Sequence, residues 1–186
     1  MDANGGLLQQ ARAVDADVPL PHIVIVIGVT GSGKSTVGHA LATRLGWRFH
    51  DADDLHSPEN VERMGQNIPL TDEHREPWLL RVRAVVDQAV RDRSGEVVAC
   101  SALKARYRDT IAGGVRGVRI VHLVGDPALL RGRIEHRAGH FAGPALLDSQ
   151  LEALEPPADA LTLDVALPVD ALVDAVVRDL QPQAGS

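Results

Sequence analysis

The sequence predicts an α/β fold in which a five-stranded parallel sheet carries helices on both faces. Three observations support this fold class. Short runs of β-branched residues alternate with longer amphipathic segments along the 186-residue chain, a pattern typical of parallel strands joined by crossover helices. The apolar runs are short and continuous, as expected for strands that are buried on both faces. A glycine-rich turn separates the first apolar run from the first helical pattern, and the chain length suits a single domain.

The order of the elements follows from these patterns. Strands are expected at residues 22–27, 47–50, 97–101, 118–124 and 160–165. Helices are expected near residues 35–45, 73–92, 104–112, 127–137, 145–154 and 169–180. Residues 1–21 contain a pair of glycines and two prolines without sustained periodicity. We therefore expect a flexible N-terminal arm there, followed by one domain over residues 22–186.

The glycine-rich turn is the most informative segment of the chain. It reads Gly28-Val29-Thr30-Gly31-Ser32-Gly33-Lys34-Ser35-Thr36, which fits the pattern G-x-x-x-x-G-K-[ST] between a strand and a helix. Glycines let the backbone wrap closely around an anion, and the helix that follows presents its partially positive end to the same point. Lys34 would reach the β- and γ-phosphates, and the Ser35 hydroxyl would be a ligand of Mg²⁺. The motif therefore predicts a site for a nucleoside triphosphate, and we call residues 28–36 the phosphate loop.

Three aspartates follow the second expected strand: Asp51, Asp53 and Asp54. Because alternate residues of an extended chain point the same way, we expect Asp51 and Asp53 to face one space and Asp54 to turn aside. In a phosphoryl-transfer enzyme, one of these two carboxylates would orient Mg²⁺ through water and the other would accept the proton of the attacking hydroxyl. The alternative is an acidic segment before a helix, since Ser57-Pro58-Glu59 reads as a helix start, and Asp54 fits that alternative.

Cationic side chains accompany two later segments. Arg75 could form a bidentate pair with a carboxylate substrate, or it could bind an acidic neighbour within the protein, and the spacing favours neither alternative. Lys104 and Arg108 are four residues apart and so share a helical face, which suits either an anionic substrate or an ordinary solvated surface. Cys100, at the end of the third strand, is expected to be a small core residue rather than a nucleophile. Trp78 is likewise expected to pack in the core rather than to serve as a stacking platform.

The segment after the fourth strand has the features of a lid. Arg133 and Arg137 share a helical face, and the glycines that follow them provide hinges. We expect a mobile lid at about residues 137–146 that brings cations onto the triphosphate and excludes water. His136 and His140 have a spacing found in metal sites, but no third ligand accompanies them in the sequence, which argues against zinc.

The overall composition disfavours several classes of protein. The formal net charge of −6 argues against a nucleic-acid-binding surface. No apolar run approaches the length of a membrane span, and the N-terminus lacks the basic and apolar segments of a signal peptide. A single cysteine cannot form an internal disulfide, which favours a reducing compartment. We therefore expect a cytoplasmic protein that binds neither nucleic acid nor membrane.

Longer strings around these motifs resemble the small gluconokinases that contain a phosphate loop, which are related in fold to shikimate kinase and adenylate kinase. The matching strings lie between Ile23 and Pro157. Beside the phosphate loop they are Asp51-Ala52-Asp53-Asp54-Leu55-His56, Pro69-Leu70-Thr71-Asp72, Arg75-Glu76-Pro77-Trp78-Leu79, Ala99-Cys100-Ser101-Ala102-Leu103-Lys104 and Gly139-His140-Phe141. The phosphate loop alone would specify only a nucleotide-binding protein, and the combination of strings is what points to this family.

The resemblance implies an activity and a set of site residues. The implied reaction is transfer of the ATP γ-phosphoryl group to the 6-hydroxyl of D-gluconate. The implied fold is the three-layer P-loop kinase fold with a mobile lid. Proteins of this family often form homodimers. Residues 28–35 correspond to the ATP loop and Asp53 to the substrate-side carboxylate. By analogy with related kinases, Arg133 lies near adenine and Arg137 near phosphate, and adenine also meets the loop around residues 164–168. The side chains expected to hold gluconate are Arg75, Lys104, Arg108 and His140.

The chain departs from the usual pattern of this family at several positions. His74 stands where an acidic residue is common, Arg63 replaces a frequent lysine, and Ala142-Gly143 takes the place of Met-Pro. The last change should loosen the lid, because glycine adds backbone freedom that proline removes. The alternatives are a kinase of another small hydroxy acid, such as shikimate or glycerate, and a nucleotide-binding regulator without catalysis. The presence of the phosphate-loop lysine and of the paired aspartates disfavours the regulator.

Overall fold

The computed structural model describes residues 23–66, 68–136 and 144–181. Its strands are β1 (Ile23–Ile27), β2 (Arg48–Asp51), β3 (Glu96–Ala99), β4 (Val118–Val124) and β5 (Leu161–Asp164). They form one five-stranded sheet in the order β2-β3-β1-β4-β5, with every neighbouring pair parallel. The predicted parallel sheet is therefore confirmed, whereas the predicted N-terminal arm lies outside the described residues.

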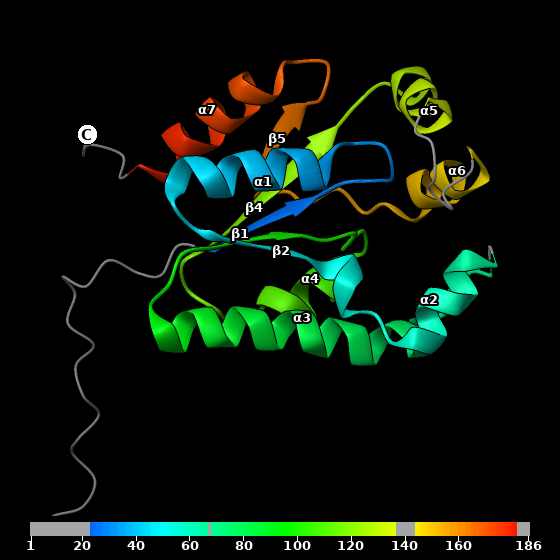
Figure 1. Cartoon of the computed structure of the whole chain (residues 1–186), viewed down its shortest axis with the longest axis horizontal. Helices are drawn as coiled ribbons and strands as arrows, with labels where there is room; N and C mark the ends of the chain where they lie inside the picture. The colour runs from blue at the N-terminus through cyan, green and yellow to red at the C-terminus, as the bar shows by residue number, and fades with distance from the viewer. Residues whose placement is uncertain (1–22, 67, 137–143, 182–186) are drawn as a thin grey trace, which may run out of the picture.

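Helices cover both faces of the sheet, which gives three layers (Figure 1). One face carries α1 (Lys34–Leu45) and α7 (Val169–Leu180), and the other carries α3 (Asp72–Asp92) and α4 (Ala105–Ala112). The end of the sheet next to the phosphate loop carries the 3₁₀ turn η1 (Ala52–Leu55), α2 (Pro58–Gly65), α5 (Pro127–Glu135) and α6 (Pro144–Ala153). The carboxyl ends of the strands point to this end, where ligands of such sheets bind.

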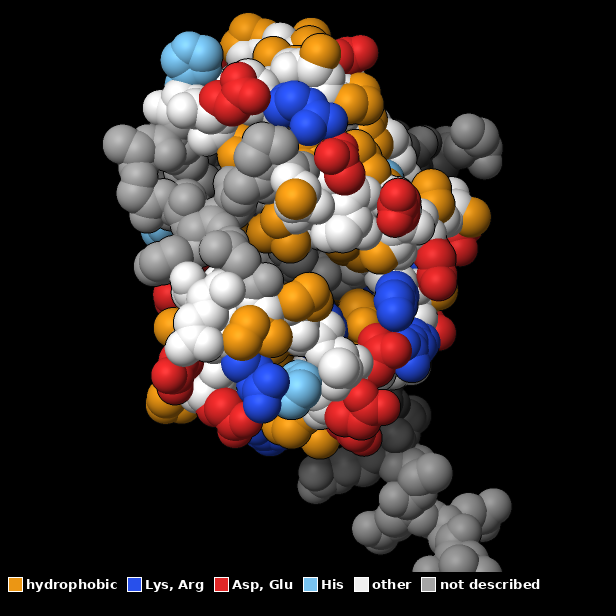
Figure 2. Space-filling view, turned by 90° about the vertical axis from the view of Figure 1, so that its right-hand side faces the viewer, with side chains coloured by type: hydrophobic (Ala, Val, Ile, Leu, Met, Phe, Trp, Pro, Cys, Tyr) orange, Lys and Arg blue, Asp and Glu red, His pale blue; other side chains and the backbone are white. Residues whose placement is uncertain are grey.

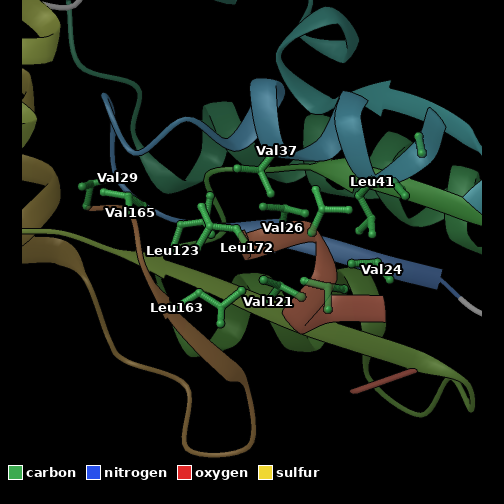
Figure 3. Close-up of a cluster of buried hydrophobic side chains, with 14 of the residues drawn as sticks. Val24, Val26, Val29, Val37, Leu41, Val121, Leu123, Leu163, Val165 and Leu172 are labelled. Carbon is green, nitrogen blue, oxygen red and sulfur yellow. The ribbon is translucent and has the colours of Figure 1, made fainter. Parts of the chain in front are cut away.

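Two hydrophobic clusters, one on each face of the sheet, hold the layers together. The residues of β1 alternate between the clusters, and all of them are buried, which explains the continuous apolar sequence of this strand. Figure 3 shows the first cluster, in which Val37 and Leu41 of α1 and Leu172 of α7 meet apolar side chains of the strands. The second cluster lies under α3 and includes the buried Trp78.

The element boundaries differ from expectation by a few residues, and one helix is new. β2 ends at Asp51 rather than at His50, so Asp51 belongs to the strand. The structure adds α2, whose start fits the Ser57-Pro58-Glu59 signal, since Ser57 Oγ accepts a hydrogen bond from the Asn60 amide at 3.2 Å.

The surface at the carboxyl ends of the strands is mixed in charge. Figure 2 views this end of the molecule, and on the described part of the face Lys and Arg side chains are interspersed with Asp and Glu. A continuous basic patch, typical of nucleic-acid-binding proteins, does not form on that part of the face. Within the described residues, each helix is either too short or too polar to span a bilayer.

Candidate active site

The phosphate loop has backbone conformations that favour glycine. Gly28 has a φ of 153°, and a Cβ there would lie 2.7 Å from the Leu123 carbonyl oxygen and 2.7 Å from Ser32 Oγ. Gly33, with a φ of 85°, directly precedes α1, and no side chain caps the first amides of that helix. These amides and the helix dipole therefore present donors to an anion. The backbone geometry of residues 28–36 is that of an anion-binding turn.

Hydrogen bonds fix the phosphate loop from inside and outside. The Lys34 ammonium and the Ser32 amide both donate to the Val29 carbonyl oxygen, each at 3.2 Å. The Thr30 amide donates to Gln150 Oε1 at 2.6 Å. The Ser32 hydroxyl is buried and has no hydrogen-bond partner among the described residues. Such a buried polar group fits a loop that completes its hydrogen bonds with a bound anion.

A cavity of about 270 Å³ lies beside the phosphate loop. The loop forms one wall, Arg133 and Ile134 of α5 form another, and Val165 and Leu167 after β5 form a third. The Arg133 guanidinium donates to the Val165 carbonyl oxygen at 2.8 Å, which fixes α5 against the segment after β5. A largely apolar cavity next to a triphosphate site suits a nucleotide base, and it lies where adenine is expected.

Ser35 and Asp51 meet at the start of α1. The Ser35 hydroxyl donates to Asp51 Oδ2 at 2.6 Å, and the Asp53 amide donates to Asp51 Oδ1 at 3.1 Å. Asp51 therefore caps η1, and the chain turns after β2. The expectation that strand alternation places Asp51 and Asp53 on one face is wrong, because residues 52–55 are helical; the turn brings the two together instead.

The pair formed by Ser35 and Asp51 fits a magnesium ion. A hydroxyl and a carboxylate 2.6 Å apart are hard oxygen ligands, and Mg²⁺ in phosphoryl-transfer sites uses one or two such groups with phosphate oxygens and water. Among the described residues, no three His, Cys, Asp or Glu side chains cluster into a metal site. A metal at this position would therefore depend on the phosphates of the nucleotide for its other ligands.

The Asp53 carboxyl lies among several charges. Surrounding protein atoms and the neighbouring Asp51 raise its pKa above the ordinary value of 3.8, while Lys34 and Arg75 act in the opposite direction. The side chain is exposed at the carboxyl end of β2. A carboxylate with a raised pKa is a better proton acceptor, so the environment of Asp53 suits a general base.

The charge of Arg75 is directed at the same space. It acts on the pKa of Asp53 and also on that of His56. Among the described residues, no carboxylate forms an ion pair with Arg75, although the side chain is half-buried. A partly buried cation without a carboxylate partner in the described part of the chain favours the alternative in which Arg75 binds a carboxylate of the substrate.

Two residues expected in the core lie beneath this space. The Trp78 ring is buried, stacks on His56 with 4.5 Å between ring centroids, and donates from Nε1 to the Ala52 carbonyl oxygen at 2.6 Å. Cys100 is buried as well, and burial raises the pKa of its thiol. Both predictions of a packing role are confirmed. The stack also fixes η1, and with it Asp53, against α3.

Lys104 and its neighbours converge on Asp72. The Lys104 ammonium lies 3.2 Å from Asp72 Oδ1, and the Arg106 guanidinium and the Tyr107 hydroxyl bind the same carboxylate. Hydrogen bonds from Tyr107, Arg106 and Lys104 hold the pKa of Asp72 well below its ordinary value. This cluster joins the start of α3 to the start of α4. Because an ammonium group has three N–H donors, Lys104 can bind Asp72 and a substrate together.

Arg108 does not share an exposed face with Lys104. Its guanidinium is buried and donates from Nη1 to the carbonyl oxygens of Ala102 at 3.1 Å and Leu103 at 2.8 Å. α4 begins only after Lys104, whose backbone is extended, so the spacing of a continuous helix does not apply to the pair. The predicted shared face is therefore wrong, and Arg108 braces the loop after β3.

Much of the predicted lid lies outside the described residues. This part includes Arg137 and His140, whose roles stay predictions, while residues 144–146 begin α6. The helices on either side of it are joined by an ion pair between Arg131 of α5 and Asp148 of α6, 2.8 Å apart.

Two polar residues at the site were not singled out by the sequence reasoning. Asp72 belongs to one of the matching strings, but its partner Lys104 is 32 positions away, so the string alone gives no charge partner. Gln150 meets the phosphate loop across 120 positions, and a glutamine in an amphipathic helix carries no local signal. Both contacts arise only when the sheet brings distant segments together.

Comparisons with known proteins agree with this geometry. A family model described as an AAA domain matches residues 23–157. A probable gluconokinase of Rattus norvegicus is 44% identical over 155 residues, which cover 74% of this chain and 84% of that protein. A gluconokinase of Gluconobacter oxydans is 39% identical over 166 residues, which cover 88% and 93% of the two chains. The crystal structure of a gluconokinase from Sinorhizobium meliloti is 41% identical, with a TM-score of 0.75 and coverage of 87% and 92%. The chain therefore belongs to the gluconokinase family.

Proposed function

We propose that the protein is an ATP-dependent gluconokinase, which converts D-gluconate and ATP into 6-phospho-D-gluconate and ADP. The observation that carries this proposal is the contact that joins Asp53 to the phosphate loop through Asp51. The Asp53 amide donates to Asp51 Oδ1 at 3.1 Å, and the Ser35 hydroxyl donates to Asp51 Oδ2 at 2.6 Å. Lys34 of the loop and Arg75 of α3 both lower the pKa of the Asp53 carboxyl, so both cations act on it. A base beside a triphosphate loop, with a further cation acting on it, suits phosphoryl transfer to a hydroxy acid.

The reaction divides between Asp53 and the phosphate loop. Asp53 accepts the proton of the 6-hydroxyl, whose oxygen attacks the γ-phosphorus as the bond to the leaving ADP oxygen breaks. Lys34 and the amides at the start of α1 stabilise the negative charge on the transferred group and on ADP. Mg²⁺ held by Ser35, and through water by Asp51, would neutralise further charge on the phosphates.

Arg75 and Lys104 are the described cations that we assign to the carboxylate of gluconate. That carboxylate lies at the opposite end of the sugar acid from the 6-hydroxyl, so the groups that bind it cannot be the groups that act on phosphate. Asp72 keeps Lys104 in place, and the absence of an ion pair at Arg75 within the described residues leaves its guanidinium to the substrate. Glucose has hydroxyls but no carboxylate, so these contacts predict a strong preference for gluconate.

The test is gluconate-dependent release of ADP from Mg²⁺-ATP, with the product identified by phosphorus NMR. The acceptors are gluconate, shikimate, glycerate and glucose, and the matched variants are Arg75→Met and Glu76→Gln, its exposed neighbour. We expect turnover with gluconate, little with glucose, and a loss of this preference in Arg75→Met only. Turnover with shikimate or glycerate in place of gluconate would overturn the substrate, and binding of ATP without any acceptor would favour the regulator. The homodimer implied by the resemblance is a separate proposal, tested by sedimentation.

A further inference from the structure

The peptide group between Val29 and Thr30 is held from both sides. Its carbonyl oxygen accepts hydrogen bonds from the Lys34 ammonium and the Ser32 amide, each at 3.2 Å. Its N–H donates to Gln150 Oε1 at 2.6 Å. Because a peptide group is planar, any rotation of the N–H also rotates the carbonyl oxygen. The orientation in which the amide meets Gln150 is therefore the orientation in which the carbonyl receives Lys34.

Gln150 comes from a helix that is fixed in the fold. Leu147, three residues earlier in α6, is completely buried and so lies on the same face of the helix as Gln150. Asp148 forms the ion pair with Arg131 that joins α6 to α5. The carboxamide therefore reaches the phosphate loop from a helix whose own position is set by packing and charge.

We propose that Gln150 is a positioning residue for phosphoryl transfer: through the Val29–Thr30 peptide it sets the position of the Lys34 ammonium. The proposal rests on the proposed kinase function, because Lys34 is the group that reaches the β- and γ-phosphates. Without the Gln150 oxygen, the half-buried Thr30 amide loses its acceptor and the peptide rotates toward another one. Lys34 then meets the phosphates from a shifted position, which lowers turnover.

The same geometry gives a reason for glutamine rather than glutamate at this position. Both side chains carry an oxygen that can accept the Thr30 hydrogen bond. A carboxylate would add a negative charge against the phosphate loop, where the triphosphate is expected, and a like charge in a partly enclosed site weakens anion binding. A neutral carboxamide holds the peptide without repelling the negative charge of the ATP phosphates.

Two variants separate the hydrogen bond from the charge. Gln150→Met keeps the length of the side chain but removes the oxygen, whereas Gln150→Glu keeps the oxygen and adds a charge. The control is Ser149→Ala, because the Ser149 hydroxyl is exposed and its one hydrogen bond among the described residues goes to the Leu146 carbonyl oxygen of its own helix, at 3.0 Å. For each variant, kcat, both KM values and the Kd of a non-hydrolysable ATP analogue are measured below the thermal midpoint.

We expect Gln150→Met to lower kcat by about 10- to 100-fold with little change in KM for gluconate. Gln150→Glu should keep most of kcat but raise KM for ATP and Kd for the analogue, and Ser149→Ala should behave like the parent. The proposal is overturned if the kcat of Gln150→Met equals that of the Ser149→Ala control, or if Gln150→Glu loses as much kcat as Gln150→Met. A parent protein that binds the analogue but does not phosphorylate gluconate would overturn the proposed function instead, and the Kd values would then still test Gln150: weaker binding in Gln150→Glu alone supports it.

Discussion

The two sides of the active site are built in different ways. The nucleotide side is one continuous segment, the phosphate loop, whose binding groups are mainly backbone amides set by glycine conformations. The substrate side consists of side chains from separate elements: Asp53 of η1, Arg75 of α3 and Lys104 before α4. Local backbone geometry fixes the first side, and contacts across the fold, such as that of Lys104 with Asp72, fix the second.

Because of this difference, amino-acid substitutions should affect the two sides of the site differently. Backbone amides do not change with sequence, so the nucleotide side keeps its chemistry as long as the glycines and Lys34 are present. Side chains on separate elements can be exchanged one at a time, so the substrate side can change its specificity while the fold stays the same. Substitutions should therefore divide into those that affect ATP and those that affect gluconate.

The largest effect is expected at the nucleotide side, for Lys34→Ala. This change removes the charge that meets the β- and γ-phosphates, so turnover should fall by about 1,000-fold or more. Steady-state kinetics with saturating gluconate measures it. A turnover close to that of the parent would mean that the phosphate loop does not act in the reaction.

Asp53→Asn should have the next largest effect, at the boundary between the two sides. Loss of the general base lowers kcat by about 100-fold or more, while the ATP analogue should bind with nearly unchanged Kd. Equal losses of turnover and nucleotide affinity would show that Asp53 serves the nucleotide rather than the proton transfer.

The same variant should gain stability, for a reason that the pKa supplies. A raised pKa means that the folded state favours the protonated carboxyl of Asp53. The stability that this group contributes is therefore fully present below pH 3.8, and it is lost as the pH rises through the pKa of the folded state. At pH 7 the ionised Asp53 therefore costs stability, and asparagine removes that cost. Asp53→Asn should unfold at a higher temperature than the parent at pH 7, with the difference shrinking below pH 4; an unchanged midpoint at pH 7 would contradict this.

A smaller and more selective effect is expected for Asp72→Asn on the substrate side. The change weakens the bonds to Lys104, Arg106 and Tyr107, so Lys104 loses its position and KM for gluconate should rise about tenfold. KM for ATP should stay constant, as should both values in Glu76→Gln on the same helix. An increase in KM for ATP of the same size would remove the distinction between the two sides.

The last prediction concerns the pH dependence of stability beneath the substrate side. Burial and the charges of Arg75 and Arg81 lower the pKa of His56 to about 4, so the folded protein loses stability as the pH falls from about 6.5 toward 4, where only the unfolded chain takes up this proton. His56→Gln should flatten this dependence by up to roughly 1 kcal/mol per pH unit. Urea unfolding between pH 4 and 7 measures it, and parallel curves for the two proteins would contradict the assignment.

The sequence was a better guide to the nucleotide side than to the substrate side, for physical reasons. A strand, a glycine-rich turn and a helix are local features, so the sheet, the phosphate loop and the role of Trp78 in the core could be predicted directly. Asp53 was expected beside Asp51 because alternate residues of a strand face the same way, and that reason was wrong. The two residues meet because Asp51 caps η1, and such a cap is not visible in a strand pattern.

Charges that meet across the fold could not be assigned from spacing. The spacing of Lys104 and Arg108 suggested one helical face, but α4 begins after Lys104 and Arg108 turns into the protein. Asp72 and Gln150 act on segments 32 and 120 positions away, and only the folded sheet shows those partners. Sequence reasoning therefore finds functional groups such as Lys34 and Lys104, and it misses the distant side chains, Asp72 and Gln150, that position them or their loop.

The central claim is that separate groups bind ATP and gluconate, and the most direct test measures the binding of both ligands to two variants. Calorimetry would give the Kd of the ATP analogue with Mg²⁺ and the Kd of gluconate for Lys34→Ala and for Lys104→Met. The structure predicts a crossed result: Lys34→Ala loses affinity for the analogue and keeps gluconate, and Lys104→Met does the reverse. If Lys104→Met weakens the analogue as much as gluconate, or leaves gluconate binding unchanged, the division of the site proposed here is wrong.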